Sequence, residues 1–432
     1  MLGTALVLLF AQRGNPVARL LALPPLVFVG LISYSLYLWH QPLFAFARLH
    51  LDEPGRGLMP SLAALAMVLA TASWWFVERP FRRHRYAPAE RRRALAQGSV
   101  ALALFAGFAA FGMIGDGVWG RLTRNRDPQV LAFVASAKLR TSSEFECGVS
   151  IAARRLEPCW LRGGPQSGRR IALFGDSHAQ AFRPALVAAA ADGDVGVLYS
   201  ADAGCPPLAG LYVIDGMYDS RLCGRLAARQ LAAAIANRVD TVVMVARWTL
   251  YTDDEARNAP QRNLLAEARA PWWPDREASR RALARGLAET LAAYRRAGIE
   301  VVVVDQVPQQ RFALARRVGW LRYQPVAAAA LPPLIASLAV PIERDLWLQG
   351  WNRALLRRSA GDGVRVVSLA PAFVADGRYP WGDAQTAWYS DETHLSVAGA
   401  RRLGPAMAAL LDLPNDGGHR RAPAPSRLAP EP

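Results

Sequence analysis

Long apolar runs fill most of the first 115 residues, whereas short apolar runs alternate with helical patterns in the remainder of the chain. A helix needs about 20 apolar residues to cross a bilayer, and residues 20–47, 58–77 and 94–115 are long enough. Residues 1–11 are apolar but short, and they look like the end of a helix that starts further upstream. Buried helices of a soluble protein are the alternative, but three such runs with polar flanks favour a membrane segment.

The distribution of arginine predicts how this segment is oriented. Residues 78–93 read ERPFRRHRYAPAERRR and form the most basic short loop, so we expect this loop in the cytoplasm. The basic loop at residues 13–19 then lies on the same side of the membrane. The last span leads the chain outward, so everything after about residue 116 is predicted to lie outside the cytoplasm.

All four cysteines lie beyond residue 115, in the part of the chain that the charge pattern places outside the cytoplasm. Four cysteines allow three pairings, and the sequence alone does not choose among them. Two local bridges, Cys147–Cys159 and Cys205–Cys223, would suit an oxidising compartment. Four buried thiols are the alternative interpretation.

Beyond residue 168, apolar β-type runs alternate with helical patterns, which is typical of a parallel sheet covered by helices on both faces. The predicted strands are residues 170–175, 195–199, 241–246, 300–305 and 364–368. The predicted helices are residues 178–191, 221–237, 276–297, 347–358 and 396–411. We therefore expect a three-layer α/β domain over residues 169–412.

The remaining segments are predicted to connect or flank this domain. Residues 1–115 form the membrane segment, and residues 116–168 are polar enough to be a linker. The long stretch 250–275, which contains Trp272-Trp273, is interpreted as an insertion or lid. Residues 413–432 are rich in Pro, Arg and Ala and are expected to be a disordered tail.

Two short blocks carry the candidate chemistry. Residues 171–182, IALFGDSHAQAF, predict a strand, a tight turn and a helix, with Ser177 in the turn. A helix N-terminus carries partial positive charge that favours an oxyanion. Far downstream, Asp391 and His394 stand three residues apart, so they can meet on one turn and supply the base and orienting acid that a nucleophilic serine needs. A serine that only caps a helix, with a surface histidine, is the structural alternative.

The blocks GDSH and DETHLSVAGA resemble the first and last blocks of SGNH-type esterases and acetyltransferases. This resemblance implies a flavodoxin-like parallel sheet with Ser177 as nucleophile, His394 as base and Asp391 as the acid that orients it. His178 either fixes the turn or lines the pocket; it is not assigned as the base, because the D-x-x-H block fits that role better.

The oxyanion donors of the family are matched less well. Gly204 follows the second predicted strand, where the family places its glycine donor, and it is also explained as a turn glycine before Cys205. The family carries an asparagine after the third strand, but this chain has Arg247 there. Arg247 would donate to the oxyanion, bind an anionic acceptor or form a structural ion pair.

A second resemblance covers the apolar segment. Residues 30–44 (GLISYSLYLWHQPLF) and 74–83 (WWFVERPFRR) resemble the final spans of the acyltransferase-3 membrane family. Some members of that family add a linking span and a periplasmic SGNH domain. The earlier spans, which handle the acyl donor in the family, have no counterpart here, so a missing N-terminal membrane domain or a partner is expected. His40 and Glu78 are either polar groups at wet helix ends or functional groups within the membrane.

Composition indicates which partners, metals and cofactors are not expected. The formal net charge of +16 would suit nucleic acid, but the arginines are spread out and partly flank apolar segments, so nucleic acid is not expected. The cysteines form no C-x-x-C pair, so a zinc site is not expected. No bound cofactor is expected either.

The resemblances together predict an O-acyltransferase in the bacterial inner membrane, with several spans and a periplasmic SGNH domain. Acetyl-CoA is the expected donor. A lipid-linked glycan or polysaccharide, such as lipopolysaccharide O-antigen, is the expected acceptor, with membrane lipid as a further partner. Two alternatives stay open: a periplasmic esterase that removes acetyl groups, and a non-catalytic glycan-binding module.

Overall fold

The computed structural model describes residues 15–50, 57–80, 88–113, 124–138, 147, 156–191, 193–214, 220–252, 263–267, 275–311 and 314–412. The chain divides into two units, Met1–Leu122 and Thr123–Pro432. Three predictions lie outside the described residues: the apolar start at residues 1–11, Trp272-Trp273 of the insertion, and the tail at residues 413–432.

The first unit is helical. Its elements are α2 (Pro16–Leu21), α3 (Pro24–His50), α4 (Leu58–Ser73) with its π-helical continuation η1 (Trp74–Glu78), and α6 (Pro88–Met113). Two helical segments, Leu58–Glu78 and Arg92–Gly112, are long and apolar enough to cross a membrane. The predicted span at residues 20–47 is largely helical in α3, but it is not one of these two, so a third span stays a prediction.

The prediction of a loop at residues 13–19 was wrong in part, because helix α2 begins at Pro16. The side chain of Asn15 accepts a hydrogen bond from the backbone N–H of Val17 at 2.9 Å and so caps the helix. Proline at the first helical position suits this start, because its fixed φ is already helical.

The polar residues that the sequence singled out in this unit have local partners. The hydroxyl of Ser35 on α3 donates to the carboxylate of Glu78, and the indole N–H of Trp39 donates to Ser73 Oγ at 2.8 Å. His40 Nδ1 lies 3.0 Å from the carbonyl oxygen of Leu36, one turn earlier in the same helix. The first two contacts join α3 to α4 and η1, so these polar side chains help to pack the helices.

The second unit is built on a six-stranded sheet with the order β1-β3-β2-β5-β7-β9. Its strands are β1 (Cys159–Arg162), β2 (Arg169–Gly175), β3 (Val195–Ala201), β5 (Thr241–Val245), β7 (Glu300–Val304) and β9 (Val364–Val367). All pairings are parallel except that of the edge strand β1 with β3. The predicted parallel α/β sheet is confirmed, and β2 lies where the strand order reverses, which is the usual place for a site in such sheets.

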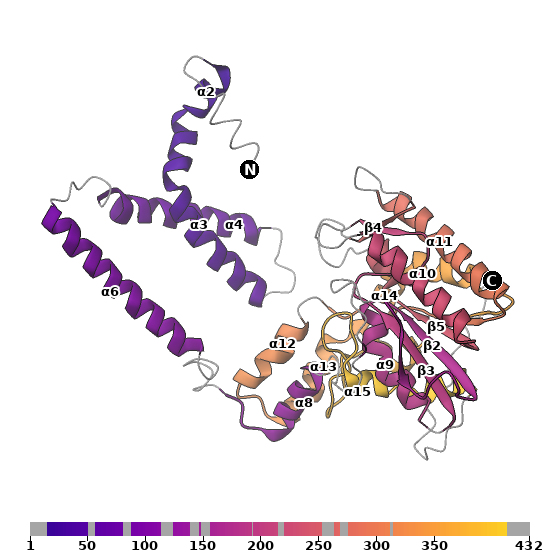
Figure 1. Cartoon of the computed structure of the whole chain (residues 1–432). Coiled ribbons are helices and arrows are strands. Elements are labelled where there is room, and N and C mark those ends of the chain that lie inside the picture. The colour runs from indigo at the N-terminus through magenta and orange to yellow at the C-terminus, as the bar shows by residue number, and fades with distance from the viewer. Residues whose placement is uncertain are drawn as a thin grey trace. The chain divides into compact units, whose positions relative to one another are not determined.

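Alternation along the strands creates two cores, one on each face of the sheet. On β2, Ile171 and Leu173 join one core, and Ala172 and Phe174 join the other. The first core is covered by α9 (Ser177–Ala189), α15 (Val397–Arg401) and α16 (Gly404–Leu410). The second is covered by α10 (Ser220–Ala236), α11 (Arg276–Arg296) and α14 (Ile342–Arg358). Figure 1 shows α10 and α11 on the opposite side of the sheet from α9.

Elements with few residues escaped the sequence analysis. Residues 116–168 are not only a linker, because they contain α8 (Pro128–Lys138) and β1, and the ring of Phe133 is fully buried in the first core. The 250–275 insertion contains β6 (Leu264–Ala266), which pairs with β4 (Tyr212–Ile214). Other unpredicted elements are α12 (Leu314–Trp320), α13 (Leu331–Leu338), β8 (Val340–Pro341) and β10 (Arg378–Tyr379). The predicted helix 396–411 is divided in two, with Pro405 in the first turn of α16.

Two disulfides, Cys147–Cys159 and Cys205–Cys223, join neighbouring segments with Cα–Cα distances of 5.9 and 5.1 Å. These separations lie in the usual range for disulfides. The local pairing is therefore confirmed among the three that the sequence allowed. The second bridge fixes the segment directly after Gly204 to helix α10.

The close approach of Gly399 to the chain before the C-terminal helices yields a stability prediction. A Cβ at Gly399 would collide with the carbonyl oxygen of Trp388, whereas a Cβ at Gly350 in α14 would meet nothing within 4 Å. Gly399→Ala should lower the free energy of unfolding by about 1–3 kcal/mol. Gly350→Ala should leave it unchanged or raise it by up to about 1 kcal/mol. Urea unfolding of both purified variants compares them, and equal midpoints would contradict the packing described for Gly399.

Candidate active site

Ser177, the candidate nucleophile, follows a turn that requires a glycine at its start. Strand β2 ends at Gly175, where a Cβ would collide with the carbonyl oxygen of Val245 on the neighbouring strand β5. Asp176 follows in extended conformation and caps α9 by accepting the N–H of His178 at 2.8 Å. Ser177 is therefore the first residue of α9, at the carboxyl end of β2. The strand–turn–helix geometry predicted for this block is present.

Asp176 anchors this turn to the loop after β5. The Asp176 side chain is fully buried, and its Oδ2 accepts hydrogen bonds from the backbone N–H of Arg247 at 2.9 Å and from the hydroxyl of Tyr251 at 2.8 Å. Burial raises the pKa of the Asp176 carboxyl above its ordinary value, and these donors offset only part of that rise. The residue before the nucleophile thus holds two loops together.

Ser177, His394 and Asp391 meet although they come from opposite ends of the domain. His394 Nε2 lies 2.7 Å from Ser177 Oγ, and His394 Nδ1 lies 2.9 Å from both carboxylate oxygens of Asp391. This chain of contacts places a base beside a hydroxyl and an acid behind the base. It can remove the serine proton and stabilise the imidazolium that forms.

Asp391 shapes its own loop as well as orienting the histidine. Its Oδ1 accepts the backbone N–H groups of Thr393 at 2.9 Å and His394 at 2.8 Å. Burial alone would raise the pKa of the Asp391 carboxyl, but the hydrogen bonds from His394 and from these two N–H groups together hold it well below its usual range. The carboxylate is therefore ionised at neutral pH.

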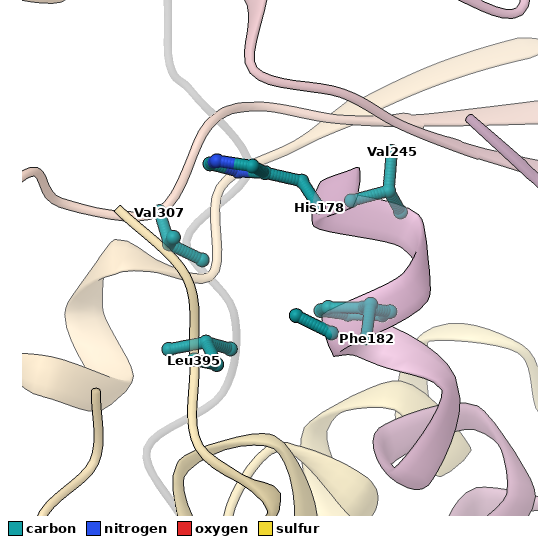
Figure 2. Close-up of a pocket in the computed structure, with 6 residues that line it drawn as sticks. His178, Phe182, Val245, Val307 and Leu395 are labelled. Atoms are coloured by element: carbon teal, nitrogen blue, oxygen red, sulfur yellow. The ribbon is translucent and has the colours of Figure 1, made fainter. Parts of the chain in front are cut away.

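His178 lies close to the histidine of the triad. It is buried, and its ring centroid is 5.0 Å from that of His394. Burial, followed by the nearby His394 and Arg247, lowers the pKa of His178 well below its ordinary value, so the ring is neutral. It borders a small cavity of about 10 Å³ that is otherwise lined by apolar side chains: Ala181, Phe182, Val245, Val307 and Leu395. Figure 2 shows His178 with four of these side chains. The His178 ring thus lines a small cavity, while its backbone N–H takes part in the cap at Asp176.

The two oxyanion candidates have different surroundings. Gly204 adopts a φ of +70°, which favours glycine, and a Cβ there would lie 2.9 Å from Asn263 Nδ2. Arg247 is buried, and its backbone N–H is used by Asp176. Asn263 carries no recognisable signal in the sequence, because it lies in the 250–275 insertion and comes near Gly204 only in the folded chain.

Comparisons with known proteins agree with this geometry. A family model described as "SGNH domain (fused to AT3 domains)" matches residues 144–409, a range that contains Ser177, Asp391 and His394. No curated protein matches the chain.

Three solved structures are similar over part of the chain. The periplasmic domain of a lipopolysaccharide acetyltransferase from Salmonella ser. Paratyphi A is 14% identical, with a TM-score of 0.40, over 57% of this chain and 85% of that one. A protein described as an acylhydrolase from Bacteroides fragilis is 10% identical, with a TM-score of 0.31, over 63% and 96%. A GDSL-like lipase from Bacteroides thetaiotaomicron is 11% identical, with a TM-score of 0.31, over 56% and 86%.

The environment of Asp391 predicts how stability depends on pH. Its pKa is lower in the folded chain than in the unfolded one, so its contribution to stability is present above about pH 4 and is lost as pH falls through the folded value. At pH 7, Asp391→Asn should lower the free energy of unfolding by about 2 kcal/mol. The difference from wild type should shrink below about pH 4.

Urea unfolding at several pH values measures this difference. Asp362→Asn, which removes an exposed carboxylate from a turn, serves as the control and should behave as wild type. An Asp391→Asn chain that is as stable as wild type at pH 7 would contradict the hydrogen bonds assigned to this carboxylate.

Proposed function

Because the chain belongs to the family of SGNH domains that are fused to AT3 domains, we propose that it is a membrane-bound O-acyltransferase. It transfers an acetyl group to a sugar hydroxyl of a cell-surface glycan, such as lipopolysaccharide O-antigen. The observation that carries this proposal is the continuous contact from Ser177 Oγ through His394 to Asp391. Acyl transfer through a serine ester is the chemistry for which this arrangement is suited.

The first half of the reaction loads the serine. His394 Nε2 takes the proton of Ser177 Oγ as the oxygen attacks the carbonyl carbon of the acyl donor. The bond from that carbon to the leaving group breaks, and His394 returns the proton to the leaving group. We propose that cytoplasmic acetyl-CoA is the source of the acetyl group, that a carrier in the membrane brings it to the periplasmic side, and that the product on the enzyme is acetyl-Ser177.

The second half transfers the acetyl group. A sugar hydroxyl attacks the ester carbon while His394 takes its proton, and the bond to Ser177 Oγ breaks. The proton then passes from His394 to Ser177, which restores the starting state. The glycan gains one acetyl ester, and the charges balance at each step.

Negative charge on the carbonyl oxygen needs donors in both halves. The N–H of Ser177 lies in the first turn of α9, a 13-residue helix whose N-terminal dipole favours an anion. We assign Gly204 as the second donor, since its turn follows β3, the strand next to β2. Arg247, buried in the loop after β5, is the remaining candidate for a role in binding this charge.

The membrane location supports a surface glycan as the acceptor. Two helical segments, Leu58–Glu78 and Arg92–Gly112, are apolar enough to anchor the chain, and two disulfides suit a domain outside the cytoplasm. We therefore place the SGNH domain in the periplasm of a bacterium, with the helices in the inner membrane.

Acetyl content of the glycan tests the proposal. Cells that produce the wild-type chain should carry O-acetyl esters on their purified surface glycan, and cells that produce Ser177→Ala should carry none, because the alanine cannot form the ester. Nuclear magnetic resonance of the glycan measures the acetyl groups, and immunoblotting shows equal protein levels. Ser337→Ala, which removes an exposed hydroxyl from α13, should acetylate as wild type.

Two results would contradict the proposal. Acetylation that persists in Ser177→Ala cells would place the reaction elsewhere in the chain or in another protein. Glycan that loses acetyl groups when the wild-type chain is present would instead indicate an esterase.

A further inference from the structure

An irregular segment after β7 is buried along its whole length. Residues 305–310, DQVPQQ, have no regular secondary structure, yet every one of them is buried. We call these residues the strap. Irregular segments normally run over the surface, because a buried one must find partners for its backbone polar groups inside the protein. The hydrogen-bond partners of the strap therefore indicate which parts of the domain it connects.

The backbone of the strap is fixed at three points. The N–H of Asp305 donates to the carbonyl oxygen of Val367 on β9 at 2.9 Å. The N–H of Gln309 donates to Asp345 Oδ1 at 3.1 Å, and the N–H of Gln310 donates to the carbonyl oxygen of Glu392 at 2.7 Å. The last contact reaches the loop between Asp391 and His394, so the strap touches the loop that carries the base.

Side chains of the strap also hold the loop after β5. Gln306 Oε1 accepts the backbone N–H of Thr249 at 3.1 Å and its hydroxyl at 2.9 Å. That loop contains Arg247 and Tyr251, which bind Asp176 beside the nucleophile. One segment thus links the two loops that flank Ser177 and His394.

Helix α14 supports the strap with a polar stripe that is unusual for a buried helix face. Four of its polar side chains are at most 5% exposed, and Gln349 lies four residues after the first and three or four before the last two: Asp345, Gln349, Asn352 and Arg353. Gln349 Nε2 donates to Asp345 Oδ1 at 2.8 Å and to the carbonyl oxygen of Val307 in the strap at 3.2 Å. Asn352 Nδ2 donates to Thr252 Oγ1 at 2.7 Å, at the end of the loop after β5.

The guanidinium of Arg353 in this stripe lies between two carboxylates, one on α14 and one in the strap. Arg353 Nη2 lies 2.8 Å from Asp345 Oδ2, and Arg353 Nε lies 3.3 Å from Asp305 Oδ2. Burial raises the pKa of Asp305 to about 7, although the Arg353 guanidinium lowers it. Tyr379 of β10 faces the same charges, and burial, with Asp345, raises its pKa to about 12. Burying two carboxylates and an arginine costs folding free energy. Hydrophobic residues in their place would often give a fold that is equally stable.

We propose that Asp345 is a positioning residue, which holds the strap so that the strap in turn sets the loop of Asp391 and His394 against Ser177. This inference rests on the proposed function only in so far as Ser177 is the nucleophile. Asp345 holds the strap through Gln309 and is itself fixed by Arg353. The distance from His394 to Ser177 then depends on a buried carboxylate that touches neither residue.

Removing Asp345 need not unfold the domain. Without it, Arg353 keeps Asp305 as its partner, so the buried charges become one acid and one base instead of two acids and one base. Asp345→Ala leaves the N–H of Gln309 without its acceptor, which frees the strap. In Asp345→Asn, the amide oxygen can still accept from Gln309, but the amide cannot pair with the Arg353 cation. The two variants should therefore be impaired to different degrees.

The test uses the purified full-length chain in detergent and a fluorophosphonate probe, which reacts with an activated serine and needs no glycan. Asp345→Ala should slow the labelling of Ser177 about tenfold, because a displacement of about 1 Å at a catalytic group can cost up to about 100-fold. Asp345→Asn should slow it about threefold. Glu343→Gln, which removes an exposed carboxylate from the first turn of the same helix, should label at the wild-type rate.

Hydrolysis of a chromogenic acetate ester by the same variants separates positioning from binding. We expect kcat to fall with the labelling rate while KM stays unchanged. Melting temperatures are measured alongside, and if Asp345→Ala fails to fold, Asp345→Asn decides the outcome.

Three outcomes would overturn the inference in distinct ways. Variants that label at the wild-type rate, even if they melt at a lower temperature, would reduce Asp345 to a purely structural residue. An increase in KM with unchanged kcat would point to substrate binding instead of positioning. A wild-type chain whose Ser177 is not labelled at all would refute the proposed function, and this inference with it.

Discussion

The hydrogen bond between Ser177 Oγ and His394 Nε2, 2.7 Å long, is the contact on which the account of this domain depends. Its two residues lie 217 positions apart, at the start of the first helix after β2 and just before the last two helices. A hydroxyl and an imidazole at this distance exchange a proton readily, whereas a small displacement ends the reaction. The fold must therefore hold these two residues in place to within a fraction of an ångström, although they lie far apart in the sequence.

The structure secures this contact with buried polar groups, although most of the domain is held by apolar packing. Asp176 binds the loop after β5, Asp391 binds its own turn, and Asp345 binds the strap. Each carboxylate accepts backbone N–H groups, so each fixes main chain as well as side chains. Hydrogen bonds are directional in a way that apolar contacts are not, which makes them suited to setting a distance.

The sequence predicted those elements of the domain that are determined by residues close together in the chain. The five parallel strands that it identified are β-type runs with helical patterns between them. The spacing of Asp391 and His394 was enough to place them on one turn. The short strands β4 and β6 carry little periodicity, and their pairing depends on contacts between distant segments.

The segments that support the site were hidden for a different reason. The strap contains Asp305, Gln306, Gln309 and Gln310, which is the composition of an exposed loop, and only the fold shows that all are buried. The polar positions of α14 likewise suggest a solvent-facing side, although Asp345 and Gln349 point inward. In both cases tertiary contacts supply the hydrogen-bond partners, and a single sequence does not reveal which residues those are.

The most direct test of the central claim is to observe the covalent intermediate. The purified chain is incubated with an activated acetyl ester, quenched in acid, digested, and measured by mass spectrometry. If Ser177 is the nucleophile, the peptide that contains it gains the mass of one acetyl group, and the same peptide of Ser177→Ala gains none. Acetylation confined to another residue, or turnover of the ester with no acetyl-Ser177 even when the quench is faster than turnover, would contradict this assignment.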